Sequence, residues 1–364
     1  MINILILQKY LMPYRVPLFN AIAERKNINL SVLFYGTKEV RRKSTIYPET
    51  KFTYEQSRVL SIKSDYDYNY DIPLSLYLDL KRFKPDIIIC APDFGGVAAL
   101  IYTTIHNSKY IIWSEGTHLT EKSRNCLRIP FRKMIYSRAW RFLVPGQLAA
   151  AYIRSFVSNA DIFLANNAIQ FEECFQITEK ELEEKFAKNI VQITFSGSII
   201  KDKGITLLID AFRSLLNNHP KYQQQYFLKI LGTGPLDLRN YYDKNIIFTG
   251  FIEGQDYIHN MKASHIFVLP SLHDCNPLTV IEALFAGNIL IVSDAVGNYP
   301  EAVQGNGLVI PTGSSEEIYK ALKYILSLPR QELTQMAKRS LELSGNFTVQ
   351  RSALGFIKAI FYKN

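Results

Sequence analysis

The alternation of short, branched apolar segments with helix-like segments constrains this chain more than any other feature. In the first half, the apolar segments are residues 2–7, 30–35, 87–90 and 110–113. Continuous apolar runs of this length are typical of parallel strands that are covered on both faces. We therefore predict a parallel sheet wrapped by helices, a Rossmann-like arrangement, in the first half of the chain.

The same pattern starts again after about residue 170. Strands are predicted at residues 191–195, 227–231, 246–249, 266–269 and 289–293, with helices at 204–217 and 278–286. A length of 364 residues suits two α/β domains, and 48% hydrophobic residues can fill two cores. Ligands of such folds bind beyond the carboxyl ends of parallel strands, so we expect a ligand-binding cleft there.

The cysteines and the net charge limit the expected cellular compartment and the kind of partner, but they do not identify the function. The four cysteines are widely spaced and form no C-x-x-C pair, which supports neither a zinc site nor a disulfide framework. The sequence shows no signal peptide and no apolar run of membrane-spanning length, so we expect a cytoplasmic protein. The net charge of +9 requires an anionic partner: a membrane surface, a nucleic acid or a phosphorylated substrate.

The segment richest in chemistry surrounds one predicted helix start. Asn276 suits the N-cap, Pro277 the first helical position and Gly287 the residue after the last turn. Asp274 then lies in the preceding loop and Glu282 in the second turn. Free amides at the helix start would bind a diphosphate, and the two carboxylates would accept hydrogen bonds from sugar hydroxyls. For an arbitrary helix, a capping role for Asp274 and a solvated Glu282 would be the better interpretation.

This segment resembles the E-x7-E signature of the retaining GT-B glycosyltransferases, specifically glycosyltransferase family 4. Four further segments resemble the family in the expected order: the strand and glycine turn at 195–204, the G-x-G-P loop at 231–235, the strand and turn at 248–252, and the pair 293–294 with 300–303. The resemblance implies a GT-B fold, in which two Rossmann-like domains face each other across a cleft. It places an acceptor domain at residues 1–168, a donor domain at 169–347, and a C-terminal helix at about 348–364 that packs back on the first domain.

The resemblance also assigns roles to residues of the second half. Glu282 matches the acid that binds the ribose hydroxyls, Asp274 the acid that contacts the donor sugar, and Lys203 the base that neutralises the diphosphate. For Lys203, the alternative is a solvated surface lysine. Other donor-site positions match the family's glycine turns, its nucleobase-contacting turn and its helix start: Gly197, Gly232, Gly234, Phe251, Ile252, Asn276, Pro277, Leu278 and Thr279.

Two departures from the family pattern concern the donor site. The family usually has glutamate at the position of Asp274, and the shorter acid reaches about one methylene less. The family often has a second diphosphate-binding arginine where Ser198 stands. Either Lys201 replaces it or the turn binds through its backbone amides. A non-catalytic homologue stays open as an alternative.

Three residues of the first half are candidates for the acceptor side. Arg15 follows the first strand and either holds an acceptor phosphate or is a surface arginine at a helix start. Glu115 and His118 follow the strand at 110–113, at an end that faces the expected cleft. Either of them would orient the acceptor hydroxyl or stabilise the donor, and for His118 a loop histidine without a catalytic task is an equal competitor.

Two further features of the first half concern membranes and metals. A basic run with interleaved apolar residues favours attachment to an anionic membrane surface over a merely solvated face: Lys122, Arg124, Arg128, Arg132, Lys133, Arg138 and Arg141. No nucleic-acid-binding motif accompanies it, so we expect no nucleic-acid partner. Asp65 and Asp67 form the D-x-D of the other main glycosyltransferase fold, which we interpret as coincidence, and no metal is expected.

Together these observations predict a metal-independent retaining glycosyltransferase. It would move a sugar, with a UDP-sugar as the expected donor substrate and no cofactor, to a hydroxyl of a glycan or lipid-linked acceptor. By analogy, the setting is lipopolysaccharide, capsule or exopolysaccharide assembly, in the cytoplasm or at the inner face of the plasma membrane. The alternatives are an epimerase or hydrolase of nucleotide sugars with the same fold, and a membrane-binding homologue without catalysis.

Overall fold

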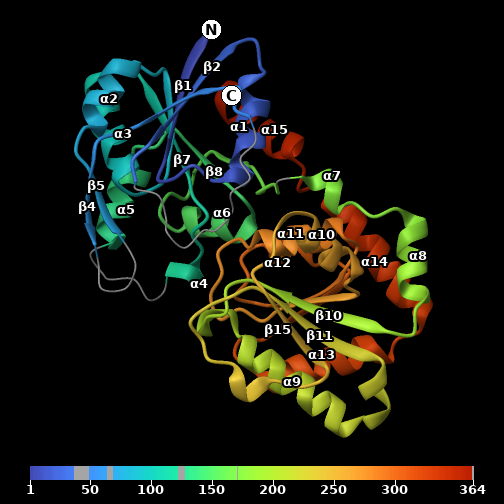
Figure 1. Cartoon of the computed structure of the whole chain (residues 1–364). Coiled ribbons are helices and arrows are strands. Elements are labelled where there is room, and N and C mark those ends of the chain that lie inside the picture. Colours follow the sequence, from blue (N-terminus) through green and yellow to red (C-terminus); the bar gives the residue numbers. More distant parts are fainter. Residues whose placement is uncertain (37–48, 64–68, 122–127, 170, 363–364) are drawn as a thin grey trace. The chain divides into compact units, whose positions relative to one another are not determined.

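A computed structural model describes residues 1–36, 49–63, 69–121, 128–169 and 171–362. It divides into an N-terminal unit, Met1–Gln170 with Val349–Asn364, and a C-terminal unit, Phe171–Thr348 (Figure 1). From the sequence, the corresponding boundaries were expected after residues 168 and 347. The D-x-D pair of Asp65 and Asp67 falls outside the described residues, as do Lys122, Arg124 and Cys126.

The N-terminal unit is built on a parallel sheet. Its strands in the described residues are β1 Ile2–Gln8, β2 Ile28–Phe34, β3 Thr53–Gln56, β6 Ile87–Cys90, β7 Lys109–Trp113, β8 Arg141–Val144 and β9 Ile162–Leu164. They are paired in the order β3-β2-β1-β6-β7-β8-β9, with every pair parallel. A separate antiparallel hairpin consists of β4 Val59–Lys63 and β5 Asn69–Pro73. The predicted Rossmann-like sheet is confirmed, and its first strand is buried on both faces as its apolar run indicated.

Helices cover both faces of this sheet (Figure 1). One face packs against α2 Leu76–Phe83, α3 Phe94–Ile105, α5 Arg128–Tyr136 and α6 Gln147–Arg154. The other face packs against α1 Val16–Ala23 and α15 Val349–Phe361. The short turns are η1 Pro13–Arg15 and α4 His118–Glu121. The C-terminal helix therefore completes the core of the N-terminal unit.

Arg141, at the start of β8, fixes the end of α15. Its guanidinium donates to the carbonyl of Ala359 at 2.8 Å and to that of Tyr362 at 2.6 Å, and it pairs with Asp161 at 2.8 Å. Only 3% of Arg141 is exposed. The prediction that this residue belongs to a membrane-facing basic surface is wrong, because its charge is used to satisfy the last carbonyls of a helix.

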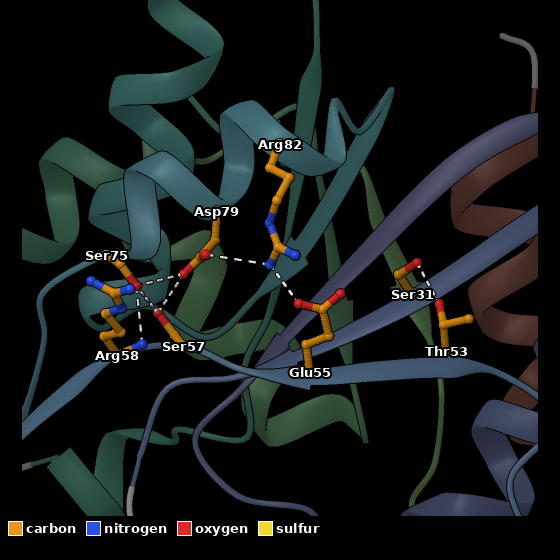
Figure 2. Close-up of polar contacts among 8 residues, drawn as sticks. All are labelled: Ser31, Thr53, Glu55, Ser57, Arg58, Ser75, Asp79 and Arg82. Atoms are coloured by element: carbon orange, nitrogen blue, oxygen red, sulfur yellow. Dashed lines mark hydrogen bonds and ion pairs between the residues drawn. The ribbon is translucent and has the colours of Figure 1, made fainter.

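A polar network ties the edge of the N-terminal sheet to α2 (Figure 2). The Asp79 carboxylate accepts hydrogen bonds from Ser57 at 2.7 Å and from Ser75 at 2.8 Å. Arg82, one turn later, pairs with Glu55 of the edge strand β3 at 2.5 Å. The ion pair between Arg82 and Glu55 is solvent-exposed and contributes little alone. The network nevertheless anchors β3, which has one neighbour among the described strands of the sheet.

The C-terminal unit is a second parallel sheet. Its strands in the described residues are β10 Val191–Ser196, β11 Tyr226–Leu231, β12 Ile246–Gly250, β13 Ile266–Leu269, β14 Ile289–Ser293 and β15 Gly307–Ile310. They are paired in the order β12-β11-β10-β13-β14-β15, again all parallel. The chain runs outward from β10 in one direction and then outward from β13 in the other. The order thus reverses between β10 and β13, and this is the switch point at which doubly wound folds bind ligands.

The helices of the C-terminal unit include several that the sequence patterns left unassigned. They are α7 Glu172–Phe175, α8 Glu179–Ala187, α9 Ile205–Asn218, α10 Gly254–Ala263, α11 Leu278–Phe285, α12 Tyr299–Ala302, α13 Ser315–Ser327 and α14 Arg330–Ser344, with short 3₁₀ turns η2 Lys201–Lys203, η3 Pro220–Gln224 and η4 Arg239–Tyr241. The charged segment at residues 171–188, whose composition favours helix, forms α7 and α8, and a capping box between Thr178 and Glu181 starts α8. In the described part of the chain, no helix is both long enough and apolar enough to cross a membrane.

Candidate functional site

The candidate site lies at the switch point of the C-terminal sheet, where the segments that leave β10 and β13 meet. The amide of Leu272 donates to the carbonyl of Asp202 at 2.7 Å, which joins the two segments. Beside this bond, the ammonium of Lys203 pairs with the carboxylate of Asp274. Both side chains are mostly buried, with 21% and 12% exposed. The structure thus brings together two predicted donor-site residues that are 71 positions apart, and Lys203 is not the freely solvated lysine of the alternative interpretation.

Glycines allow the backbone around this point to pack closely. A Cβ on Gly232 would lie 2.0 Å from the carbonyl oxygen of Gly197, and one on Gly234 would lie 2.1 Å from that of Ile199. Gly204 has φ +65°, and a Cβ there would lie 2.1 Å from the carbonyl oxygen of Pro270. Only glycine fits such contacts. The turns after β10 and β11 therefore form one layer of exposed backbone at the carboxyl edge of the sheet.

The start of α11 supplies backbone amides next to the Lys203–Asp274 pair. Its N-cap is Pro277, so the prediction of Asn276 as N-cap and Pro277 as the first helical residue is wrong by one position. The buried Asn298 fixes this start by donating to the carbonyl of Pro277 at 3.0 Å. Pro277 makes no side-chain cap hydrogen bond, and amides in the first turn of a helix have no partner within the helix, so they suit a ligand. Gly287 follows the C-cap with φ +59°, as predicted.

Glu282 lies in the second turn of α11, as predicted, and its carboxylate is hydrogen-bonded. Oε2 accepts from the hydroxyl of Tyr257, on α10, at 2.6 Å. That hydroxyl lies 2.9 Å from Oγ of Ser196, the last residue of β10. Burial raises the pKa of Glu282 to about 7, although the bond from Tyr257 opposes the shift. The interpretation of Glu282 as a solvated helix residue is wrong.

Two predicted donor-site residues lie in the loop after β12. Phe251, 45% exposed, and Ile252 follow Gly250, whose φ of +72° turns the chain. The carbonyl of Gly250 accepts a hydrogen bond from the amide of Gly232 at 2.9 Å. This loop is therefore attached to the glycine layer on the β11 side of the switch point.

The acceptor-side candidates of the N-terminal unit do not form one cluster. Arg15 is buried and pairs with Glu115 at 2.7 Å, and its guanidinium stacks on Trp113 at 3.9 Å from the ring centroid. The interpretation of Arg15 as a surface arginine is wrong. Asn167 also donates to Glu115, at 3.1 Å. His118 begins α4, is exposed and lies edge-on to the ring of Tyr152.

Further charged groups lie at the carboxyl edge of the N-terminal sheet, and they were not predicted as site residues from the sequence. Lys9, directly after β1, lies 3.8 Å from the buried Asp71. The hydroxyl of Tyr35 donates its one proton to the carboxylate of Asp93, just beyond β6, and lies 2.7 and 2.8 Å from the two carboxylate oxygens. Burial raises the pKa of Asp93. Because β1 and β6 are adjacent, these groups lie at the switch point of this sheet, and their positions after two predicted strands were a signal that would have found them.

The predicted basic surface is only partly present. Arg132 is mostly buried, pairs with Glu121 at 2.9 Å and donates to the hydroxyl of Tyr152 at 2.7 Å. Lys133 and Arg138 are exposed, with Ile129 and Met134 exposed near them. Fewer cations are therefore exposed on this surface than the basic run in the sequence predicted.

The C-terminal unit matches the sequence model of a known protein family. Residues 176–342 match the family described as glycosyl transferases group 1. The C-terminal unit is thus similar to the group 1 glycosyltransferases over most of its length. The matched region contains all the predicted donor-site residues, including Lys203, Asp274 and Glu282.

Sequence relatives of the chain are also named as glycosyltransferases. The uncharacterized glycosyltransferase MJ1069 of Methanocaldococcus jannaschii is 27% identical over 52% of this chain and 50% of its own length. The capsular polysaccharide biosynthesis glycosyltransferase CapM of Staphylococcus aureus is 27% identical over 45% of each chain. The chain thus spans about half the length of these curated relatives.

The whole chain is similar to solved structures of the same fold. Anabaena Alr3699/HepE in complex with UDP and glucose superposes with a TM-score of 0.73 at 14% identity, over 99% of both chains. The chain therefore has the GT-B fold, with a Rossmann-like sheet in each unit.

Proposed function

We propose that this chain transfers a sugar from a nucleotide diphosphate sugar to a hydroxyl group, with retention of configuration. The observation that carries the proposal is the convergence of Lys203, Asp274 and the start of α11 at the switch point of the C-terminal sheet. A cation and uncapped amides there suit a diphosphate, and carboxylates suit sugar hydroxyls. HepE, similar in fold, was solved with UDP and glucose, which supports UDP as the nucleotide.

Each residue of the candidate site would bind a different part of the donor. Glu282 would accept hydrogen bonds from the ribose hydroxyls, and Phe251 with Ile252 would contact the base. Lys203 and the amides of Leu278 and Thr279 would bind the diphosphate and stabilise the charge that develops as the nucleotide leaves. Asp274 would contact the donor sugar. Because Lys203 supplies the positive charge, the proposed reaction uses no metal.

The N-terminal unit would bind the acceptor. Glu115, held by Arg15 and Asn167, is a carboxylate with fixed geometry, and His118 is an exposed imidazole. CapM is named for capsular polysaccharide biosynthesis, which supports surface-polysaccharide assembly as the setting, and a glycan or lipid-linked acceptor is part of our proposal. Lys133 on α5, Arg138 just beyond it and the exposed apolar residues of α5 would attach the chain to an anionic membrane.

Nucleotide titration tests the proposal. We expect calorimetry to show UDP bound more tightly than GDP or ADP, unchanged by EDTA. Absence of binding by every diphosphate would contradict the enzyme and leave the non-catalytic homologue. A panel of UDP-sugars, each with and without a lipid-phosphate acceptor, then separates the functions. Turnover of the donor that does not depend on the acceptor would indicate the epimerase or hydrolase instead.

Replacing Lys203 by methionine tests the diphosphate site. The variant loses a charge-assisted contact worth about 1.5–3 kcal/mol, so UDP should bind about 10- to 100-fold more weakly. Uridine, which lacks the phosphates, should bind equally to both proteins. Lys188→Met is the matched control, because Lys188 is exposed and precedes β10 at the opposite edge of the sheet. Equal loss of UDP binding in both variants would contradict the assigned role.

A further inference from the structure

We propose that Tyr257 is the positioning residue of the candidate nucleotide site: its phenol holds one oxygen of the Glu282 carboxylate and leaves the other for the hydroxyls of the ligand. The inference deepens the proposed function and rests on it. Tyr257 lies outside all the segments that resemble the glycosyltransferase family, and it is 25 positions from Glu282 in the sequence. The chain of contacts from Ser196 through Tyr257 to Glu282 carries the proposal.

The direction of these hydrogen bonds follows from counting protons. A phenol has a single proton, and at 2.6 Å from an ionised carboxylate it is donated to Oε2 of Glu282. Ser196 must then donate its own proton to the phenol oxygen, at 2.9 Å. Successive bonds in one direction polarise each other and strengthen the bond to the carboxylate. Among the described residues, Tyr257 is the only hydrogen-bond partner of the Glu282 carboxylate, so Oε1 is left to accept from a ligand.

Packing fixes the phenol independently of these bonds. Tyr257 lies in the first half of α10, which begins at Gly254 with φ +63° and is anchored by the buried Ile258 and Met261. The ring of Phe175, from α7, packs edge-on to the Tyr257 ring with centroids 6.0 Å apart. The ring would therefore keep its place without its hydroxyl, and Tyr257→Phe removes the bond without removing the packing.

The bond also affects the charge of Glu282. Burial raises the pKa of this carboxyl to about 7, and the bond from Tyr257 lowers it toward its ordinary value. The ionised form is a pure acceptor at both oxygens, whereas protonation turns one oxygen into a hydrogen-bond donor. The helices packed against α11 carry further ionisable groups: Glu172 and Glu173 on α7, Asp256 and His259 on α10, Glu301 on α12, and Lys338 and Arg339 on α14. In the described part of the chain, none of these groups forms a hydrogen bond or an ion pair with Glu282. Loss of the Tyr257 hydroxyl should therefore move the titration of Glu282 to higher pH.

The experiment is UDP binding to the full chain as a function of pH. With Tyr257→Phe, we expect the Kd at pH 6.5 to rise about 8-fold, which corresponds to a shift of about one pH unit in the titration of Glu282, and the difference to fall to about 1.1-fold at pH 9. Ser196→Ala, which keeps the bond to Glu282, should give a smaller shift in the same direction. Tyr226→Phe is the matched control, a buried tyrosine on β11, and it should leave the profile unchanged.

The outcomes separate the two proposals. If the wild-type chain binds no nucleotide at any pH, the proposed function fails. If the wild type binds UDP and Tyr257→Phe has the same Kd from pH 6 to 9, the positioning role is overturned. A loss that is equal at every pH also overturns it, because that pattern indicates altered packing. If Tyr257→Phe does not fold, the pH dependence of UDP binding to Ser196→Ala decides. A pH profile equal to that of the wild type would refute the chain of hydrogen bonds from Ser196 through Tyr257 to Glu282.

Discussion

Glutamine in place of Glu282 should cost about 100-fold in UDP affinity at pH 8 and, at the same pH, make the C-terminal unit more stable. The affinity falls because a neutral amide accepts hydrogen bonds with one atom only, and its NH₂ group opposes the ribose hydroxyls that a carboxylate would bind. About 3 kcal/mol, the upper range for a hydrogen bond to a charged group, corresponds to this loss. Tyr257 can still donate to the amide oxygen of the new side chain.

The gain in stability follows from the raised pKa of Glu282. An acid whose pKa is higher in the folded state favours folding while it is protonated, and this contribution is lost as the pH rises through the folded pKa of about 7. At pH 8 the wild type therefore bears the cost of a buried charge, and the variant does not. A shift of this size would give about 3 kcal/mol for a fully buried group, and partial exposure of the side chain reduces our expectation to about 1–2 kcal/mol.

Calorimetry and thermal melts at pH 5 and pH 8 measure both effects. The melting temperatures of variant and wild type should converge toward pH 5, where Glu282 is protonated in the folded protein. Glu253→Gln is the control, since Glu253 is exposed just ahead of α10. A variant that binds UDP normally would remove Glu282 from the nucleotide site. A variant that is less stable at pH 8 would show that the carboxylate supports the fold instead of straining it.

Methionine in place of Arg141 should destabilise the N-terminal unit by about 3–5 kcal/mol. The arginine is buried and satisfies two carbonyls at the end of α15, and the change leaves both without a donor, together with Asp161. Since α15 contributes Phe356 and Ile360 to the core that it shares with α1, its release opens that core. Methionine keeps most of the volume, so the effect is due to the lost bonds.

Denaturant unfolding and limited proteolysis measure this effect. The variant should unfold at lower denaturant concentration, and cleavage should start in the last turns of α15. Arg138→Met is the matched control, because Arg138 belongs to the same basic segment but is exposed, and it should change stability by less than about 0.5 kcal/mol. Equal stability of the Arg141 variant and the wild type would refute the anchoring role.

The sequence determined the two parallel sheets and the location of the donor-side candidates. Continuous apolar runs identify strands that are covered on both faces, and the residues that follow such strands lie at the carboxyl edge of the sheet whatever the details of packing. Lys203, Asp274 and the start of α11 were located by this local pattern and by family resemblance. The exact first residue of α11 was not, because Asn298, a buried side chain 21 residues away, holds the carbonyl of Pro277.

Only the tertiary structure decided which charges are used inside the protein. Arg132 and Arg141 were predicted to be surface cations, and for Arg15 a surface position was one of two interpretations. Arg15 instead pairs with Glu115, Arg132 with Glu121, and Arg141 with the end of α15. Tyr257 and Glu282 show the same limit, since neither spacing nor charge predicts a hydrogen bond between two helices. The physical reason is common to all of them. Periodicity reports which face of an element is buried, whereas a buried polar group is determined by the partner that the fold brings to it.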